Sequence, residues 1–99
     1  MTVEISRCEA TVTVTVAGRL DTMTAPELQG ALAGATDGAA KLVFDFAGLQ
    51  YISSAGLRVL LAMNKQMMSG GGELAVVHAN QAVKDVFEMT GFSDIFSVS

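Results

Sequence analysis

The sequence contains a single cysteine, a single histidine, a single proline and no tryptophan. One cysteine cannot form an internal disulfide, and Cys8 together with His78 supplies too few ligands for a conventional zinc site. No apolar run approaches the roughly 18 residues that a membrane-spanning helix needs. We therefore expect no metal site and no insertion into a membrane.

Positive charge is also scarce. Six Lys and Arg stand against ten Asp and Glu, which gives a net charge of −4, and the basic residues form no cluster. This distribution argues against a nucleic-acid partner. Glu4 precedes any apolar stretch near the N-terminus, so we expect no signal peptide and predict a cytoplasmic protein.

The sequence does contain enough apolar residues for a globular core. Hydrophobic residues make up 51% of the chain and charged residues 16%, which is typical of a folded protein rather than a disordered one. A length of 99 residues corresponds to about one domain. We expect residues 1–99 to form that single domain.

The order of predicted elements is strand, strand, then three helix–strand units. A capping box, Thr24-Ala-Pro-Glu27, predicts that the first helix begins after Thr24. A second helix is expected from about Ala55 to Met68, and a third between Asn80 and Gly91. Strands are predicted at residues 2–8, 11–16, 42–46, 74–77 and 95–98.

The pattern of residues 11–16 indicates how many layers the fold has. They read TVTVTV, so Val12, Val14 and Val16 share one face of the strand and the threonines share the other. Strands that are covered on both faces read as continuous apolar runs, whereas a sheet covered on one face alternates. We therefore predict an α/β fold, with a four- or five-stranded mixed sheet and helices mainly on one face.

Two adjacent serines, Ser53 and Ser54, stand where a loop meets the second predicted helix. Either could be an N-cap that accepts bonds from free backbone N–H groups, and either could instead carry a chemical modification such as phosphate. A catalytic serine would need a nearby base, but the only histidine is His78 and the pattern G-x-S-x-G is absent. We expect no catalytic residue and no enzyme activity.

Three segments carry a resemblance to a known family. They are G-R-L-D-T-M-T-A-P-E-L at residues 18–28, Y-I-S-S-A-G-L-R-V-L-L at residues 51–61 and A-V-K-D-V-F-E-M-T-G-F at residues 82–92. In this order and at this spacing, the chain resembles the STAS domain family, specifically the stand-alone bacterial anti-sigma factor antagonists. The likeness extends over essentially the whole chain.

The resemblance implies a phosphorylation site. In such antagonists the usual pattern is Asp-Ser-[Ser/Thr/Ala]-Gly-Leu, and the serine after the Asp receives the phosphate. Ser54 takes the place of that serine, and Ser53 replaces the Asp, so Ser53 is the second choice. Asp21 matches an Asp that lies near the acceptor serine in the family, although a turn residue that bonds backbone N–H groups is an equal alternative.

The resemblance also implies partners. An antagonist of this kind binds an anti-sigma factor of the serine-kinase type, is phosphorylated by it, and is restored by a PP2C-type phosphatase. ATP and magnesium belong to the kinase, so no cofactor is expected in this chain. The predicted contact surface consists of Asp21, Thr22, Met23, Ser53, Ala55, Gly56, Arg58, Val59 and Met63.

Two other functions remain open at this point. The first is a STAS accessory subunit of a lipid-transport ABC complex, or a related signalling scaffold. The second is a binder of a nucleotide or another small molecule, although the sequence has no Walker-type phosphate loop.

Overall fold

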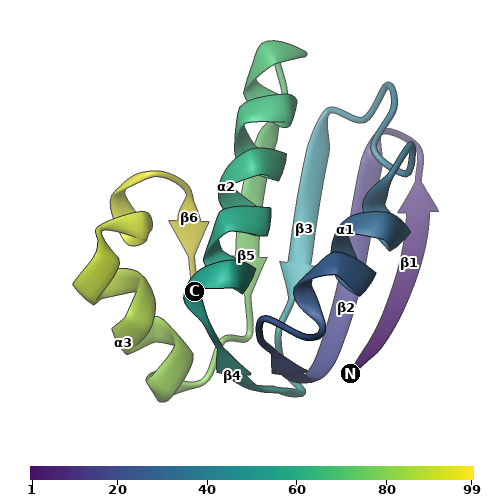
Figure 1. The fold of residues 1–99 in the computed structure, drawn as a ribbon. Coiled ribbons are helices and arrows are strands. Elements are labelled where there is room, and N and C mark those ends of the chain that lie inside the picture. The colour runs from purple at the N-terminus through teal and green to yellow at the C-terminus, as the bar shows by residue number, and fades with distance from the viewer.

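The computed structural model describes all residues from Met1 to Ser99. Six strands and three α-helices alternate along the chain, with one short 3₁₀ helix near the C-terminus (Figure 1). The elements are β1 (Thr2–Cys8), β2 (Thr11–Leu20), α1 (Ala25–Leu32), β3 (Lys41–Asp45), β4 (Leu49–Ile52), α2 (Ser54–Ser69), β5 (Glu73–Val77), α3 (Gln81–Thr90), η1 (Phe92–Asp94) and β6 (Ser97–Val98).

The strands form one mixed sheet in the order β1-β2-β3-β5-β6. β1 and β2 are an antiparallel hairpin, whereas β3, β5 and β6 each pair in parallel with their neighbours. β4 lies off this path and pairs in parallel with the last residues of β2, next to an irregularity between Gly18 and Arg19. The predicted α/β fold is confirmed, and the sheet has six strands instead of four or five.

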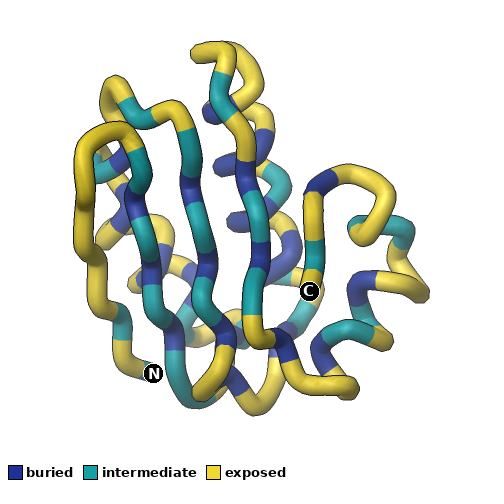
Figure 2. The backbone as a smooth tube through the Cα atoms, turned by 180° about the vertical axis from the view of Figure 1, so that it is seen from behind, coloured by how far each residue is buried: buried dark blue, intermediate teal, exposed yellow.

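The predicted face assignment is also confirmed. Val12, Val14 and Val16 are fully buried, while the alternating threonines of β2 remain half-buried. α1 and α2 lie across the face that carries the valines (Figure 1). The view from behind shows the other face of the sheet with no helix over it (Figure 2). The molecule therefore has two layers, one of helices and one of strands. This is the arrangement that the alternation of valine and threonine in β2 predicted.

The apolar core lies between the sheet and the helices. Its largest fully buried side chains include Phe44 of β3 and Phe46, which directly follows that strand, and their ring centroids are 5.7 Å apart. Phe87 of α3 packs edge-on against Phe96, with a centroid distance of 5.8 Å. This aromatic contact attaches α3 and the C-terminal segment to the edge of the sheet.

The ends of α3 follow the sequence, and α1 begins after Thr24 as predicted, but without the predicted capping bonds. Asn80 Oδ1 accepts a bond from Val83 N at 2.9 Å, and Gly91 ends α3 in the left-handed region at φ 79°. The capping box predicted for α1 is wrong, because the Thr24 hydroxyl makes no cap bond within the helix. It accepts from Asp21 N and donates to Arg19 O instead, so it fixes the loop before α1.

Candidate functional site

Pairing between β2 and β4 brings the two segments of the candidate site together. Leu20, the last residue of β2, lies opposite Ile52, the last residue of β4. Ser53 N donates to Leu20 O at 2.9 Å, one residue beyond the strand pair. The loop that begins at Asp21 and the start of α2 therefore leave the same edge of the sheet side by side.

Gly56 allows α2 to begin this close to the sheet. A Cβ atom at Gly56 would lie 2.7 Å from Leu20 Cγ and 2.9 Å from Ile52 Cγ1, which is closer than carbon atoms can approach. Glycine is required here for packing space, since its backbone angle is not in the left-handed region. Gly56, which the resemblance placed in the contact surface, is buried and so offers a partner little surface of its own.

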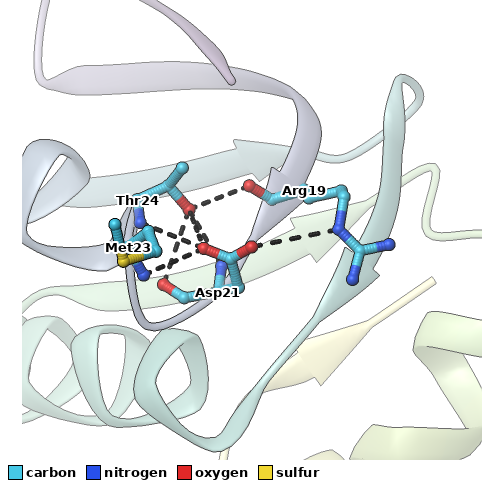
Figure 3. A network of polar contacts seen from close by, with 4 residues as sticks. All are labelled: Arg19, Asp21, Met23 and Thr24. Carbon is cyan, nitrogen blue, oxygen red and sulfur yellow. Dashed lines mark hydrogen bonds and ion pairs between the residues drawn. The ribbon is translucent and has the colours of Figure 1, made fainter.

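The loop after β2 is organised by Asp21 (Figure 3). Asp21 Oδ1 accepts from Met23 N at 3.0 Å and from Thr24 N at 3.1 Å. These bonds, above all the one from Thr24, hold the pKa of the Asp21 carboxyl below its ordinary value. Asp21 is thus a turn residue that shapes the loop, and it also lies beside the start of α2.

Arg19 extends this network toward β4. Its Nε atom lies 3.9 Å from Asp21 Oδ2, and its guanidinium carbon lies 4.4 Å above the centre of the Tyr51 ring. All three side chains reach solvent, so the cation–π contact and the ion pair contribute modestly to stability. Arg19 and Tyr51 are not among the site residues predicted from the sequence, because the pairing of β2 with β4 was not predicted.

Ser53 and Ser54 differ sharply in accessibility. Ser53 occupies the N-cap position of α2, but its hydroxyl makes no cap bond. The Ser53 Oγ atom is buried and has no hydrogen-bond partner. Ser54 is the first residue of α2 and is exposed. Ser54 is therefore the more accessible of the two serines.

The other predicted contact residues divide into exposed and buried groups. Thr22, Met23 and Arg58 are exposed and Ala55 is partly exposed, so they can meet a partner directly. Val59 and Met63 are only 7% and 6% exposed. They line shallow grooves between α1 and α2, so they offer a partner little surface of their own.

A second polar pair lies at the same edge of the sheet. His78 Nδ1 is 3.0 Å from Asp45 Oδ1, which also accepts from Ala47 N. The bond from Ala47, followed by that from His78, lowers the pKa of the Asp45 carboxyl. His78 therefore has the local hydrogen bond expected of a strand-end residue, and its partner is Asp45 and not a serine.

Metal-ligating side chains do not cluster in this structure. No three His, Cys, Asp or Glu side chains gather where they could hold a metal ion. None of the helices is long and apolar enough to cross a lipid bilayer. This edge presents an exposed serine at a helix start, the loop ordered by Asp21 beside it, and two exposed side chains, Met23 and Arg58.

The chain is similar in sequence to a known family and to named members of it. A sequence pattern described as "Mlab, STAS domain" matches residues 3–97. One relative bears the name anti-sigma factor antagonist BtrV and comes from Bordetella bronchiseptica. It is 41% identical over 83 residues, which are 83% of this chain and 72% of BtrV. The anti-sigma-B factor antagonist of Bacillus subtilis is 28% identical over 97 residues, or 98% of this chain and 89% of that protein.

Solved structures have the same fold. An anti-sigma factor antagonist from Mycobacterium paratuberculosis superposes with a TM-score of 0.87 at 26% identity, covering 98% of this chain and 83% of that one. The unphosphorylated form of the antagonist SpoIIAA gives 0.86 at 16% identity, over 99% of this chain and 88% of its own, which supports the fold alone. With the sequence pattern matched over residues 3–97, the chain belongs to the STAS domain family.

Proposed function

We propose that this protein is an anti-sigma factor antagonist that is regulated by phosphorylation of Ser54. The observation that carries the proposal is the exposure of Ser54 at the start of α2, beside the loop that Asp21 organises. The buried hydroxyl of Ser53 favours Ser54 over its neighbour as the acceptor. The relatives named above as antagonists support the same function.

The partner in this proposal is an anti-sigma factor of the serine-kinase type. The unmodified antagonist binds it and so releases the sigma factor. The kinase uses its own ATP and magnesium to phosphorylate Ser54, and a PP2C-type phosphatase reverses the change. The antagonist is then a cytoplasmic substrate of both enzymes, with no catalytic role and no cofactor of its own.

Charge explains how one phosphate can control binding. A phosphoserine carries about −1.5 to −2 charges, which must lose their water if they enter an interface. A penalty of a few kcal/mol would weaken binding on the order of 100-fold. Within the free protein the same group is tolerated, because the first turn of α2 carries no acidic side chain and the positive end of a helix dipole favours an anion.

Co-expression with a serine-kinase anti-sigma factor from the same genome tests the proposal. We expect intact-mass analysis to show one added phosphate, and peptide mapping to place it on Ser54. Ser54→Ala should bind the kinase but remain unmodified, while Ser54→Asp should bind more weakly because a carboxylate supplies part of the charge. Modification of Ser53, or equal affinity of the phosphorylated and unmodified proteins, would contradict the proposal.

A further inference from the structure

Arg58 is an exposed cation without a partner in this chain. It lies in the second turn of α2, and its side chain forms no hydrogen bond or ion pair in the structure. The ion pairs of the molecule join Arg19 to Asp21 and Lys41 to Glu73, Asp45 is hydrogen-bonded to His78, and none of these contacts involves α2. The guanidinium group is therefore free to bind an anion that is placed within its reach.

Ser54 is the position from which such an anion would reach it. The two residues are four apart, a spacing that puts both side chains on the same face of a helix, about 5–6 Å apart at their Cβ atoms. Both are exposed, so neither side chain has to leave the core to meet the other. The order is also the favourable one, because the acidic group would lie on the N-terminal side of the basic group.

The composition of α2 leaves no competitor for Arg58 within the helix. The segment reads SAGLRVLLAMNKQMMS, so Arg58 and Lys65 are its charged residues and no acidic residue is present. Lys65 lies eleven residues after Ser54, about 16 Å along the helix axis, which is too far to contact a group on Ser54. Within α2, a phosphate on Ser54 could therefore contact Arg58 but not Lys65.

We propose that Arg58 binds the phosphate of phosphorylated Ser54 within the same molecule, through an ion pair across one turn of α2. The inference rests on the proposed phosphorylation of Ser54 and adds a role for a residue of this chain. Arg58 forms a charge-assisted hydrogen bond to the phosphate oxygens and holds them against the helix. In the unmodified protein the same guanidinium stays exposed as part of the proposed partner surface. Phosphorylation therefore adds negative charge at Ser54 and also neutralises the positive charge of Arg58.

Protein carrying phosphoserine at position 54, installed during synthesis, tests this contact directly. The phosphate is titrated by phosphorus NMR in the otherwise unchanged protein, in Arg58→Gln and in the matched control Lys65→Gln, which removes one positive charge from the same helix. The phosphate should lose its second proton at a lower pH when Arg58 is present, by about 0.3 unit relative to Arg58→Gln. In Lys65→Gln the phosphate should titrate as it does in the protein that keeps both Arg58 and Lys65. Arg19 and Asp21, the charged pair at the same edge, are unchanged throughout.

A stability cycle supplies a second readout on the same proteins. Phosphoserine and Arg58 should be coupled in urea unfolding, so that their joint presence lowers the unfolding equilibrium constant about twofold beyond the two separate effects. Identical titrations of the Arg58→Gln and Lys65→Gln proteins, together with no coupling in the cycle, would overturn the inference. Because the phosphate is installed in advance, this result is independent of whether a kinase modifies Ser54.

Discussion

At the scale of single residues, two of the three α-helix N-caps show why residue type alone does not predict a capping bond. Asn80 and Ser53 both have extended backbones at the residue before a helix, and both are favoured N-cap types. Asn80 Oδ1 accepts from Val83 N, and its amide also donates to Leu49 O. The Ser53 hydroxyl is buried without any partner. The difference comes from tertiary packing at the junction of β4 and α2, which the sequence does not display.

Alanine substitutions at these caps should therefore have different effects. Asn80→Ala removes both hydrogen bonds of the side-chain amide, so it should lower the free energy of unfolding by about 1–2 kcal/mol. Ser53→Ala removes a buried hydroxyl whose desolvation is not compensated, so stability should be unchanged or higher by up to about 1 kcal/mol. Urea denaturation measures both. Equal losses for the two variants would mean that Ser53 caps α2 in solution.

The two ordered carboxylates, Asp21 and Asp45, predict a pH dependence. Backbone N–H groups, from Thr24 and Ala47 first of all, lower both pKa values below the ordinary 3.8. A lowered folded-state pKa stabilises the protein at pH values above the unfolded value and loses that contribution as pH falls through the folded one. The melting temperature should therefore drop as pH is lowered from about 5 through 4 and below.

Amide substitutions identify the groups responsible for this acid sensitivity. Asp21→Asn and Asp45→Asn keep the shape of each side chain but cannot titrate, so each should flatten the fall in melting temperature below pH 4. Glu4 is exposed and belongs to none of the ion pairs, so Glu4→Gln provides the control that removes one carboxyl group elsewhere on the surface. A profile that is as steep in Asp45→Asn as in the original protein would assign the effect to other carboxyl groups.

At the scale of elements, the sequence predicts those whose burial pattern is regular. The buried valines of β2 and the buried side chains of α3 recur at the strand and helix periods, and both elements were predicted. β4 was missed because its four residues read buried, exposed, exposed, buried, which matches neither period. Without β4, the contact of Arg19 with Tyr51 was not predicted at all, and a position of Asp21 near Ser54 was expected only from the family resemblance.

Gly56 and Gly30 both lie in helices, but only Gly56 is needed for close packing. At Gly56 an added methyl group would collide with Leu20 and Ile52, so Gly56→Ala should destabilise the protein by about 1–3 kcal/mol through displacement of α2. At Gly30, within α1, the same methyl group would meet nothing within 4 Å. Gly30→Ala should therefore stabilise the protein by about 0.5–1 kcal/mol, since alanine favours the helix. Thermal unfolding of both variants checks the opposite signs, and a stabilised Gly56→Ala protein would contradict the close approach seen here.

At the scale of the whole molecule, the two faces of the sheet have different possible uses. α1 and α2 cover one face, and the start of α2 meets the Asp21 loop at the carboxyl edge of the sheet (Figure 1). No helix covers the opposite face (Figure 2). The residues of β2, β3 and β5 that alternate with the buried ones are largely half-buried threonine, valine and alanine. α3 lies on the other side of α2 from α1 (Figure 1). The proposed partner surface thus occupies one edge of the molecule and leaves α3 outside it.

A pair of methionines tests that placement. Met23 follows Asp21 in the loop beside the start of α2, whereas Met89 lies near the end of α3, and both are 86% exposed. Because neither side chain is packed, glutamate at either position should leave the melting temperature nearly unchanged. Met23→Glu should weaken binding to the anti-sigma partner by tenfold or more, about 1.4 kcal/mol, because it replaces an adaptable apolar contact with a charge that must be desolvated. Met89→Glu should bind as the original protein does, within about twofold, since the two variants have the same net charge and differ only in place. Titration calorimetry with the purified partner measures both, and a larger loss for Met89→Glu would move the partner surface to α3.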